Sequence, residues 1–331
     1  MQISSEIVSE EELMKVFCLG EMVIDFTPGA EKNSYIKNPG GAVANVAIAL
    51  KRLGVDSVFC GKLGNDDFGF FLERFLEENG VEIACREKTD RAITTLAFVN
   101  LYEDGNRTFT FARKPGADML LSKKDIKVSA VKNADYIHAG SCSMSEGPAR
   151  KATEYALELG HRHGKIVSFD VNYRNLQWKS PEACSEQVKK VLPFVDLLKV
   201  SDEEIFLFGG EKAIPKLMQK YSVSLVAVTC GEKPAKVFWN GKVIECSVPK
   251  VKAVDTTGAG DSFWAAFLAQ LIKNGIADIN KLNRNVLEEA LSWATVAGSM
   301  TVMKYGAIPA LPSLEELELF KANTEKGRER I

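Results

Sequence analysis

Histidine is scarce in this sequence, and the cysteines form no close pairs. There are three histidines, and the seven cysteines are scattered over 331 residues with no CxxC spacing. A zinc site needs its ligands at short, recurring spacings, so no such site is expected. Most of the cysteines lie in apolar runs such as VFCLG, which is typical of buried, reduced thiols and favours the cytoplasm.

Long apolar runs and an excess of basic charge are also missing. No stretch approaches the roughly 20 apolar residues that a membrane-spanning helix needs, and residues 1–15 are polar and acidic, unlike a secretory signal. The formal net charge of -2 provides no basic field to attract nucleic acid or an anionic membrane. We therefore expect a cytoplasmic protein whose partners are small molecules, with neither nucleic acid nor a membrane among them.

Two common phosphate-binding motifs are absent. The sequence contains no GxxxxGK[ST], and no GxGxxG follows the first apolar run. The first absence argues against a P-loop nucleotide site and the second against a dinucleotide-dependent oxidoreductase.

The sequence does contain a regular alternation of apolar runs and amphipathic stretches. Val16–Phe26 is typical of a strand, and Gly40–Gly54 is typical of a helix that opens on small residues and ends on glycine. The alternation recurs through runs such as KIVSFDVN and LVAVTCG. It indicates a parallel sheet covered on both faces, so we predict the α/β class. No linker or internal repeat divides the chain, which favours one domain.

One segment breaks this alternation. Ile93–Arg113 is typical of two strands joined by a turn at residues 103–106. Together with the extended stretch Glu21–Ile36, it can form a small second sheet, for which a lid is the functional interpretation. An edge hairpin with a purely structural role is the alternative.

The most informative stretch is VDTTGAGDSF, which leads directly into an apolar helix. Glycines at the start of a helix allow a ligand close to the backbone, and the helix dipole favours negative charge there. We therefore expect the amides of Gly258, Ala259 and Gly260 to form an anion hole. Asp261 follows in the first turn, where it can take a proton from an attacking hydroxyl. A helix-capping carboxylate is the alternative role for Asp261.

The pair Gly40-Gly41 is a second place where small residues precede a helix. That helix carries Asn45, so a ligand can approach the backbone beside a carboxamide. A tight turn into a well-packed helix is the structural alternative.

These motifs resemble those of a known family. VDTTGAGDSF is similar to the C-terminal signature of the ribokinase (PfkB) sugar kinases, and the block from PGGAVANVAIALKRLG to GKLGNDDFG is similar to the N-terminal one. The resemblance implies a ribokinase-like three-layer fold, with a central mainly parallel sheet flanked by helices and a small β-sheet lid. It places a polar extension at 1–15, a kinase domain at 16–315 with lid segments at about 21–37 and 92–114, and a charged tail at 316–331.

The resemblance also implies roles for individual residues. Asp261 is similar to the catalytic base of the family, and Gly258, Ala259 and Gly260 are similar to its anion hole. The sugar-binding candidates are Asp25, Gly40, Gly41, Asn45, Phe98, Arg113 and Arg174. The candidates for binding ATP and its magnesium ion are Asn172, Ser201, Glu204, Thr229 and Gly231. Ser201 departs from the family pattern, in which asparagine is usual, and this leaves the details of magnesium positioning open.

Two further expectations come from the resemblance alone. Asp255, Thr257 and Gly306 are similar to residues that bind a monovalent cation in many members, so potassium activation is a hypothesis. Lids of this kind often pair across a two-fold axis, so a homodimer through the lid is expected.

The resemblance also bears on which sugar is the substrate. GEMVIDFTPG and DVNYRNLQW look most like fructokinases, which implies conversion of D-fructose to fructose 6-phosphate. A 2-keto-3-deoxygluconate kinase is the nearest alternative, because Arg113 and Arg174 suit a carboxylate. Ribokinase-like or nucleoside kinase activity is less favoured, since Val23 and Ala42 stand where ribokinases have asparagine and lysine. A non-catalytic sugar-binding module is the remaining alternative, against which the intact Asp261 argues.

Overall fold

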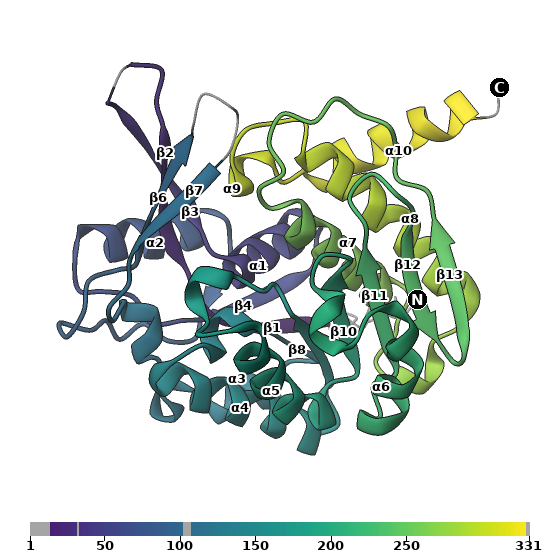
Figure 1. The fold of residues 1–331 in the computed structure, drawn as a ribbon, viewed down its shortest axis with the longest axis horizontal. Coiled ribbons are helices and arrows are strands. Elements are labelled where there is room, and N and C mark those ends of the chain that lie inside the picture. The colour runs from purple at the N-terminus through teal and green to yellow at the C-terminus, as the bar shows by residue number, and fades with distance from the viewer. Residues whose placement is uncertain (1–13, 32, 102–106, 329–331) are drawn as a thin grey trace, which may run out of the picture.

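The computed structural model describes residues 14–31, 33–101 and 107–328. Within them a central sheet has nine strands in the order β13-β12-β11-β10-β9-β8-β1-β4-β5 (Figure 1). The strands are β1 (Lys15–Leu19), β4 (Asp56–Cys60), β5 (Glu82–Ile83), β8 (Tyr136–Gly140), β9 (Ile166–Asp170), β10 (Leu197–Ser201), β11 (Leu225–Thr229), β12 (Ala235–Trp239) and β13 (Lys242–Cys246). Neighbours from β5 to β11 are parallel, while β12 and β13 form an antiparallel edge. The predicted α/β class is confirmed.

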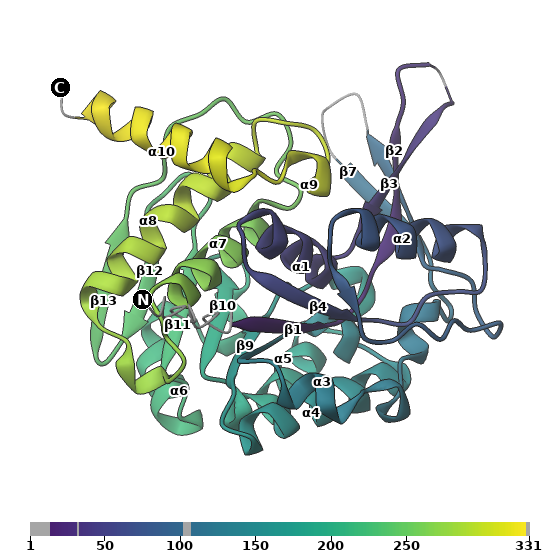
Figure 2. The ribbon, with the colours of Figure 1, turned by 180° about the vertical axis from the view of Figure 1, so that it is seen from behind.

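Helices cover both faces of this sheet (Figure 1, Figure 2). One face carries α1 (Ala42–Arg52), α2 (Asp67–Glu78), α7 (Ala259–Lys273), α8 (Arg284–Thr301), the short α9 (Ala307–Ala310) and α10 (Leu314–Arg328). The other face carries α3 (Val128–Lys132), α4 (Gly147–Arg162), α5 (Pro181–Val191) and α6 (Ile214–Tyr221). Strands β8 and β9 are buried along their whole length, as expected for a sheet with two covered faces.

Strand β1 supplies side chains to both cores. Val16 and Cys18 belong to the core under α1 and α7, whereas Phe17 and Leu19 belong to the core under α4 and α5. Successive side chains of a strand point to opposite faces, so this apolar run fills two cores at once.

A second, smaller sheet projects beside α1 and α2 (Figure 1) and has the strand order β3-β2-β6-β7. Its strands are β2 (Val23–Pro28), β3 (Tyr35–Gly40), β6 (Leu96–Leu101) and β7 (Arg107–Ala112). Three of these strands lie within the two segments predicted to form the lid, whereas β3 begins in the first segment and extends beyond it to Gly40. The turn predicted at 103–106 lies outside the described residues.

The register of this small sheet decides which side chains share a face. Asp25 in β2 lies opposite Ala97 in β6, and Phe26 lies opposite Phe98. Because side chains alternate along a strand, Asp25 and Phe98 point to opposite faces of the sheet.

The two ends of the chain were predicted to be polar or charged. Residues 1–13 of the predicted extension lie outside the described part of the chain. Helix α10 occupies most of the segment predicted as a charged tail, and its Leu317 is buried in the core shared with α8. Among the described helices, none combines the length and the apolar character needed to cross a membrane.

Candidate active site

The turn before α7 has the geometry predicted for an anion hole. Gly258 has a φ of 80°, and a Cβ there would lie 2.9 Å from Ala307, so this position requires glycine. The amide of Ala259 donates to the carbonyl of Thr256 at 3.3 Å, while among the described residues the amides of Gly258 and Gly260 have no partner. Two of the three predicted amides are therefore free to donate to an anion at the positive end of the helix dipole.

Trp264 fixes α7 against the central sheet. Its side chain is fully buried and stacks on Phe267, with 5.2 Å between ring centroids. The indole N–H donates to Oγ of Ser168 on β9 at 2.8 Å, which satisfies a buried polar group. Asp261 lies one turn earlier in α7 and is thereby held near the carboxyl end of β9.

Asp261 is buried and contacts one of the predicted sugar-binding residues. Nδ2 of Asn45 donates to Oδ2 of Asp261 at 2.7 Å, and Oδ1 of Asn45 is buried without a partner. Burial raises the pKa of Asp261 to about 6, although the Asn45 hydrogen bond acts in the opposite direction. The Asp170 carboxylate adds to the rise, while Lys199 and Arg174 reduce it. Such a carboxylate is ionised at neutral pH and still basic enough to accept a proton.

The two glycines before α1 make room for this contact and for Asp25. A Cβ at Gly40 would lie 2.0 Å from Oδ2 of Asp25, and one at Gly41 would lie 2.5 Å from the carbonyl oxygen of Glu21. Gly41 also has a φ of 112°, which side chains rarely adopt. Burial raises the pKa of Asp25 to about 6, Arg174 lowers it, and the Asp261 charge raises it again. Asp25 and Asp261 therefore lie within electrostatic range of each other.

A buried ion pair lies behind the anion-binding turn and was missed in the sequence. Nζ of Lys199 on β10 contacts both carboxylate oxygens of Asp170 on β9, at 2.8 and 2.9 Å, and both side chains are buried. A Cβ on Gly260 would lie only 3.2 Å from the same Nζ. The sequence signal was a single charge inside each of two apolar runs, LLKVS and VSFDVN.

Glu204 and Asn172 lie buried beside this ion pair. One oxygen of Glu204 accepts from the amide of Tyr173 at 2.7 Å and the other from the amide of Ser201 at 2.9 Å. Asn172 has a φ of 36°, a conformation that asparagine tolerates better than most residues. The predicted set Asn172, Ser201 and Glu204 is thus brought together at the carboxyl ends of β9 and β10.

Two further sugar-binding candidates, Arg174 and Phe98, differ in whether they lie near Asp25 and Asp261. Arg174 is exposed, and its charge lowers the pKa of both Asp25 and Asp261, so it lies within electrostatic range of the site. Phe98 stacks on Phe26 at 5.0 Å and meets Tyr35 edge-on at 5.8 Å, on the face of the small sheet turned away from Asp25. The structure therefore does not bring Phe98 together with the other sugar-binding candidates, because the strand register points it to the other face.

Arg113 is held in an ion pair. Its Nε and Nη2 donate to Oδ2 of Asp118 at 2.9 and 2.6 Å, and both side chains are buried. Burial alone would lower the pKa of Arg113, but the Asp118 carboxylate raises it above its ordinary value. The carboxyl of Glu21 lies nearby, and burial raises its pKa to about 7. Oε1 of Glu21 accepts from the amide of Ala42 at 2.9 Å, and Oε2 is buried without a partner.

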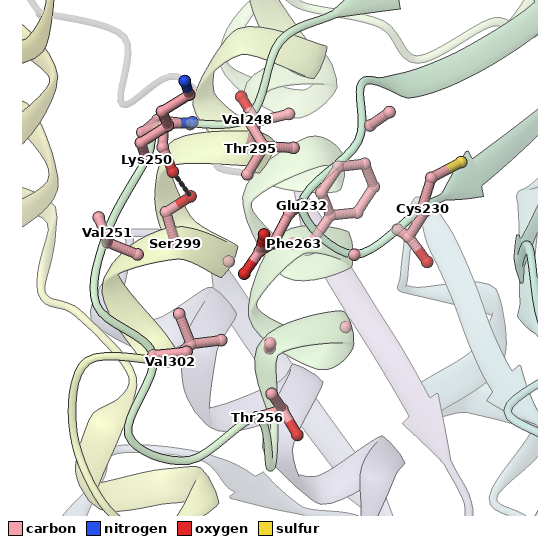
Figure 3. A pocket seen from close by; sticks show the side chains of 18 residues that line it. Cys230, Glu232, Val248, Lys250, Val251, Thr256, Phe263, Thr295, Ser299 and Val302 are labelled. Atoms are coloured by element: carbon pink, nitrogen blue, oxygen red, sulfur yellow. Dashed lines mark hydrogen bonds between the residues drawn. The ribbon is translucent and has the colours of Figure 1, made fainter.

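A cavity of about 480 Å³ opens beside the anion-binding turn (Figure 3). Its lining includes Thr229 and Gly231, together with Gly260 of the turn. Figure 3 shows Phe263 on α7, with Cys230 on one side of it and Val248 on the other. The sequence did not single out this apolar lining, which comes from β11, the loop before α7, and α8. Walls of this kind suit a planar apolar group whose charged end reaches the turn.

The three candidates for a monovalent cation also meet. Oδ1 of Asp255 accepts from the amide and hydroxyl of Thr257 at 3.0 and 2.7 Å, and Oδ2 accepts from the amide of Gly306 at 3.0 Å. Asp255 thus ties the loop before α7 to the segment before α9.

Comparison with known proteins is consistent with this geometry. A family model described as pfkB family carbohydrate kinase matches residues 14–314. The chain is similar to probable fructokinase-5 of Arabidopsis thaliana, with 41% identity over 314 residues, which cover 90% of this chain and 94% of that protein.

Solved structures show the same likeness. A fructokinase with bound ATP from Xylella fastidiosa has a TM-score of 0.87 and 30% identity, covering 94% of this chain and 99% of that chain. A fructokinase from Vibrio cholerae O395, in fructose, ADP and calcium ion bound form, has a TM-score of 0.82 and 33% identity, with 94% and 99% covered. These matches confirm the predicted ribokinase-like fold. The chain therefore belongs to the pfkB family of carbohydrate kinases and is an ATP-dependent sugar kinase.

Proposed function

We propose that this kinase phosphorylates D-fructose at its C6 hydroxyl, with Asp261 as the general base. The observation that carries the proposal is the Asn45–Asp261 hydrogen bond, because it joins a candidate sugar ligand to the candidate base beside the anion-binding turn. The fructokinases among the similar proteins support fructose as the sugar.

In this mechanism the hydroxyl oxygen of fructose attacks the terminal phosphorus of ATP while its proton moves to Asp261. The bond between that phosphorus and the bridging oxygen breaks, and ADP leaves. Asn45 keeps the carboxylate ionised and oriented. The free amides of Gly258 and Gly260 stabilise the charge on the transferred phosphoryl group.

Fructose is held by hydrogen bonds to Asp25, Asn45 and the backbone at Gly41. The side chain of Asp25 has no hydrogen-bond partner among the described residues, so its carboxylate is available to neighbouring hydroxyls. A site built to bond specific hydroxyls rejects analogues that lack them.

The nucleotide occupies the cavity beside α7, with Thr229 and Gly231 in its wall. Asn172, Ser201 and Glu204 suit a magnesium ion held through water, since both Glu204 oxygens already accept backbone hydrogens. A magnesium ion bound with ATP supplies charge neutralisation between the phosphates. Asp255, Thr257 and Gly306 hold the proposed potassium ion next to the turn.

A keto sugar acid, 2-keto-3-deoxygluconate, is the second candidate substrate. The observation that favours it is Arg174, an exposed cation that acts on both Asp25 and Asp261. A guanidinium in this place can pair with a substrate carboxylate.

Two other properties belong to this proposal. We propose that the protein is located in the cytoplasm, because all seven cysteines are free thiols. We also keep a homodimer through the small sheet, on which Tyr35 and Ile36 are exposed apolar side chains.

The deciding experiment is an ADP-release assay with magnesium-ATP and fructose, 2-keto-3-deoxygluconate, ribose and adenosine as separate acceptors. The Asp261→Ala protein is the blank. Turnover with fructose alone supports the proposal. A preference for the keto acid keeps the reaction but replaces the substrate, and turnover only with ribose or adenosine contradicts fructose.

A further inference from the structure

Arg113 directly follows β7 of the small sheet, in which Phe111 shares a face with Asp25. Phe111 in β7 is opposite Ala97 in β6, and Ala97 is opposite Asp25 in β2. Arg113 is the first residue after β7 and follows Phe111 by two residues, the spacing at which side chains of an extended chain return to the same face. A guanidinium there is placed to meet a substrate that binds Asp25.

Yet four of the five N–H donors of Arg113 are already used inside the protein. Besides its two bonds to Asp118, Nη2 donates to the carbonyl of Cys142 at 3.2 Å and Nη1 donates to Oγ of Ser145 at 3.3 Å. Its side chain is 7% exposed and that of Asp118 is 2% exposed. This arrangement leaves little of the guanidinium for a ligand.

Asp118 is itself held in place from the other side. Oγ1 of Thr95, just before β6, donates to Oδ1 of Asp118 at 2.5 Å. A Cβ at Gly116 would lie 1.8 Å from that hydroxyl and 2.7 Å from Oδ1 of Asp118, so the contact depends on glycine. The carboxylate is therefore a fixed partner of Arg113.

We propose that Asp118 is a specificity-determining residue, which pairs with Arg113 and so prevents it from receiving a substrate carboxylate. The proposal rests on the proposed function and deepens it, because it explains how the site takes a neutral ketose in preference to a keto sugar acid. An unpaired arginine fork binds carboxylates in a bidentate manner. With the pair intact, an incoming carboxylate finds no pair of free donors for a bidentate contact and meets the negative charge of Asp118.

Arg174, the other cation at the site, does not replace Arg113 in this role. It lies within electrostatic range of Asp25 and Asp261, and it also interacts with Asp170 and Glu204. These carboxylates offset its charge and oppose a further anion.

The test compares the kcat/KM ratio of 2-keto-3-deoxygluconate to fructose in wild-type protein and in Asp118→Asn. Freeing Arg113 should raise this ratio about 10- to 100-fold, the worth of a hydrogen bond to a charged group. Adding Arg113→Gln to Asp118→Asn should remove the gain. Glu21→Gln is the matched control, because it removes another carboxyl near Arg113 and keeps the bond to Ala42; the ratio should stay within about threefold.

An unchanged ratio in soluble Asp118→Asn protein overturns the proposal. If Asp118→Asn does not fold, the Asp118→Asn/Arg113→Gln protein decides, because replacing both partners of a buried pair is tolerated better than removing one. Its inhibition constant for the keto acid should equal that of the wild type; at least about tenfold weaker inhibition overturns the proposal, since Arg113 would then serve the carboxylate. If the wild-type protein does not phosphorylate fructose, the proposed function is refuted. If it phosphorylates fructose and the kcat/KM ratio is unchanged in Asp118→Asn, only this inference is refuted.

Discussion

Asn45 on α1 donates a 2.7 Å hydrogen bond to Oδ2 of Asp261 on α7. The bond favours the ionised form of Asp261, which a general base requires. Because Oδ1 of Asn45 is buried and unpartnered, the same side chain can also accept from a substrate hydroxyl.

Replacing Asn45 by alanine should move the acid limb of the pH–kcat/KM profile upward. The wild-type limb is expected near pH 6, where Asp25 and Asp261 take up protons and activity falls. Loss of a bond that lowers the pKa of Asp261 raises that pKa, so the limb shifts by about one pH unit. Asn38→Ala is the control, since Asn38 bonds Thr27 and does not touch Asp261. A limb that stays in place in Asn45→Ala would contradict the assigned role.

Asp261→Asn should lower kcat by about 10²- to 10⁴-fold, the usual contribution of a general base. The amide is nearly the same size and keeps the first turn of α7, so the affinity for ATP should change little. Rapid-quench turnover and ATP titration by calorimetry measure the two effects separately. Near-normal turnover would remove Asp261 from the base role.

Gly40→Ala should raise the KM for the sugar at least about tenfold while leaving ATP affinity unchanged. The added Cβ would lie 2.0 Å from Oδ2 of Asp25 and displace that carboxylate. Gly140→Ala is the matched control, because its Cβ would lie 3.4 Å from the nearest atom, an ordinary contact. Equal KM values in the two variants would show that Asp25 does not bind the sugar.

Lys199→Met should lower the free energy of unfolding by about 3 to 5 kcal/mol, because it leaves the Asp170 carboxylate buried without its partner. The double variant Lys199→Met/Asp170→Asn should recover most of the loss. Urea unfolding followed by circular dichroism measures both. If the double variant is as unstable as the single one, lost packing around Lys199 is the cause, and the unpaired charge is not.

Replacing potassium by a bulky organic cation should lower turnover if the loop held by Asp255 binds a monovalent ion. The measurement is kcat at constant ionic strength, with ATP and sugar saturating. An unchanged kcat refutes the potassium hypothesis and leaves Asp255 as a structural link between Thr257 and Gly306.

Local patterns predicted the larger features of the fold. The apolar runs and amphipathic stretches indicated a parallel sheet, and the hairpin pattern indicated the second sheet. The glycines before α7 indicated a close backbone approach, since their conformational effect is local.

Features that depend on pairing between distant segments were not accessible in this way. Phe98 was grouped with the sugar-binding residues, but its face is decided by which residue of β2 lies opposite it. The Asp170–Lys199 pair depends on β9 and β10 being neighbours in the main sheet. Spacing along the sequence determines neither the register between two strands nor the order of strands in a sheet.

Because the side chains of β1 belong to both cores, this strand limits which insertions the enzyme can tolerate. β1 runs through Gly20 into β2, so one extra residue early in β1 would shift every later position by one. Phe17 and Leu19 would exchange cores with Val16 and Cys18. If the shift continued into β2, the carboxylate of Asp25 would turn toward the aromatic cluster around Phe26. A one-residue insertion there would therefore damage folding and sugar recognition together.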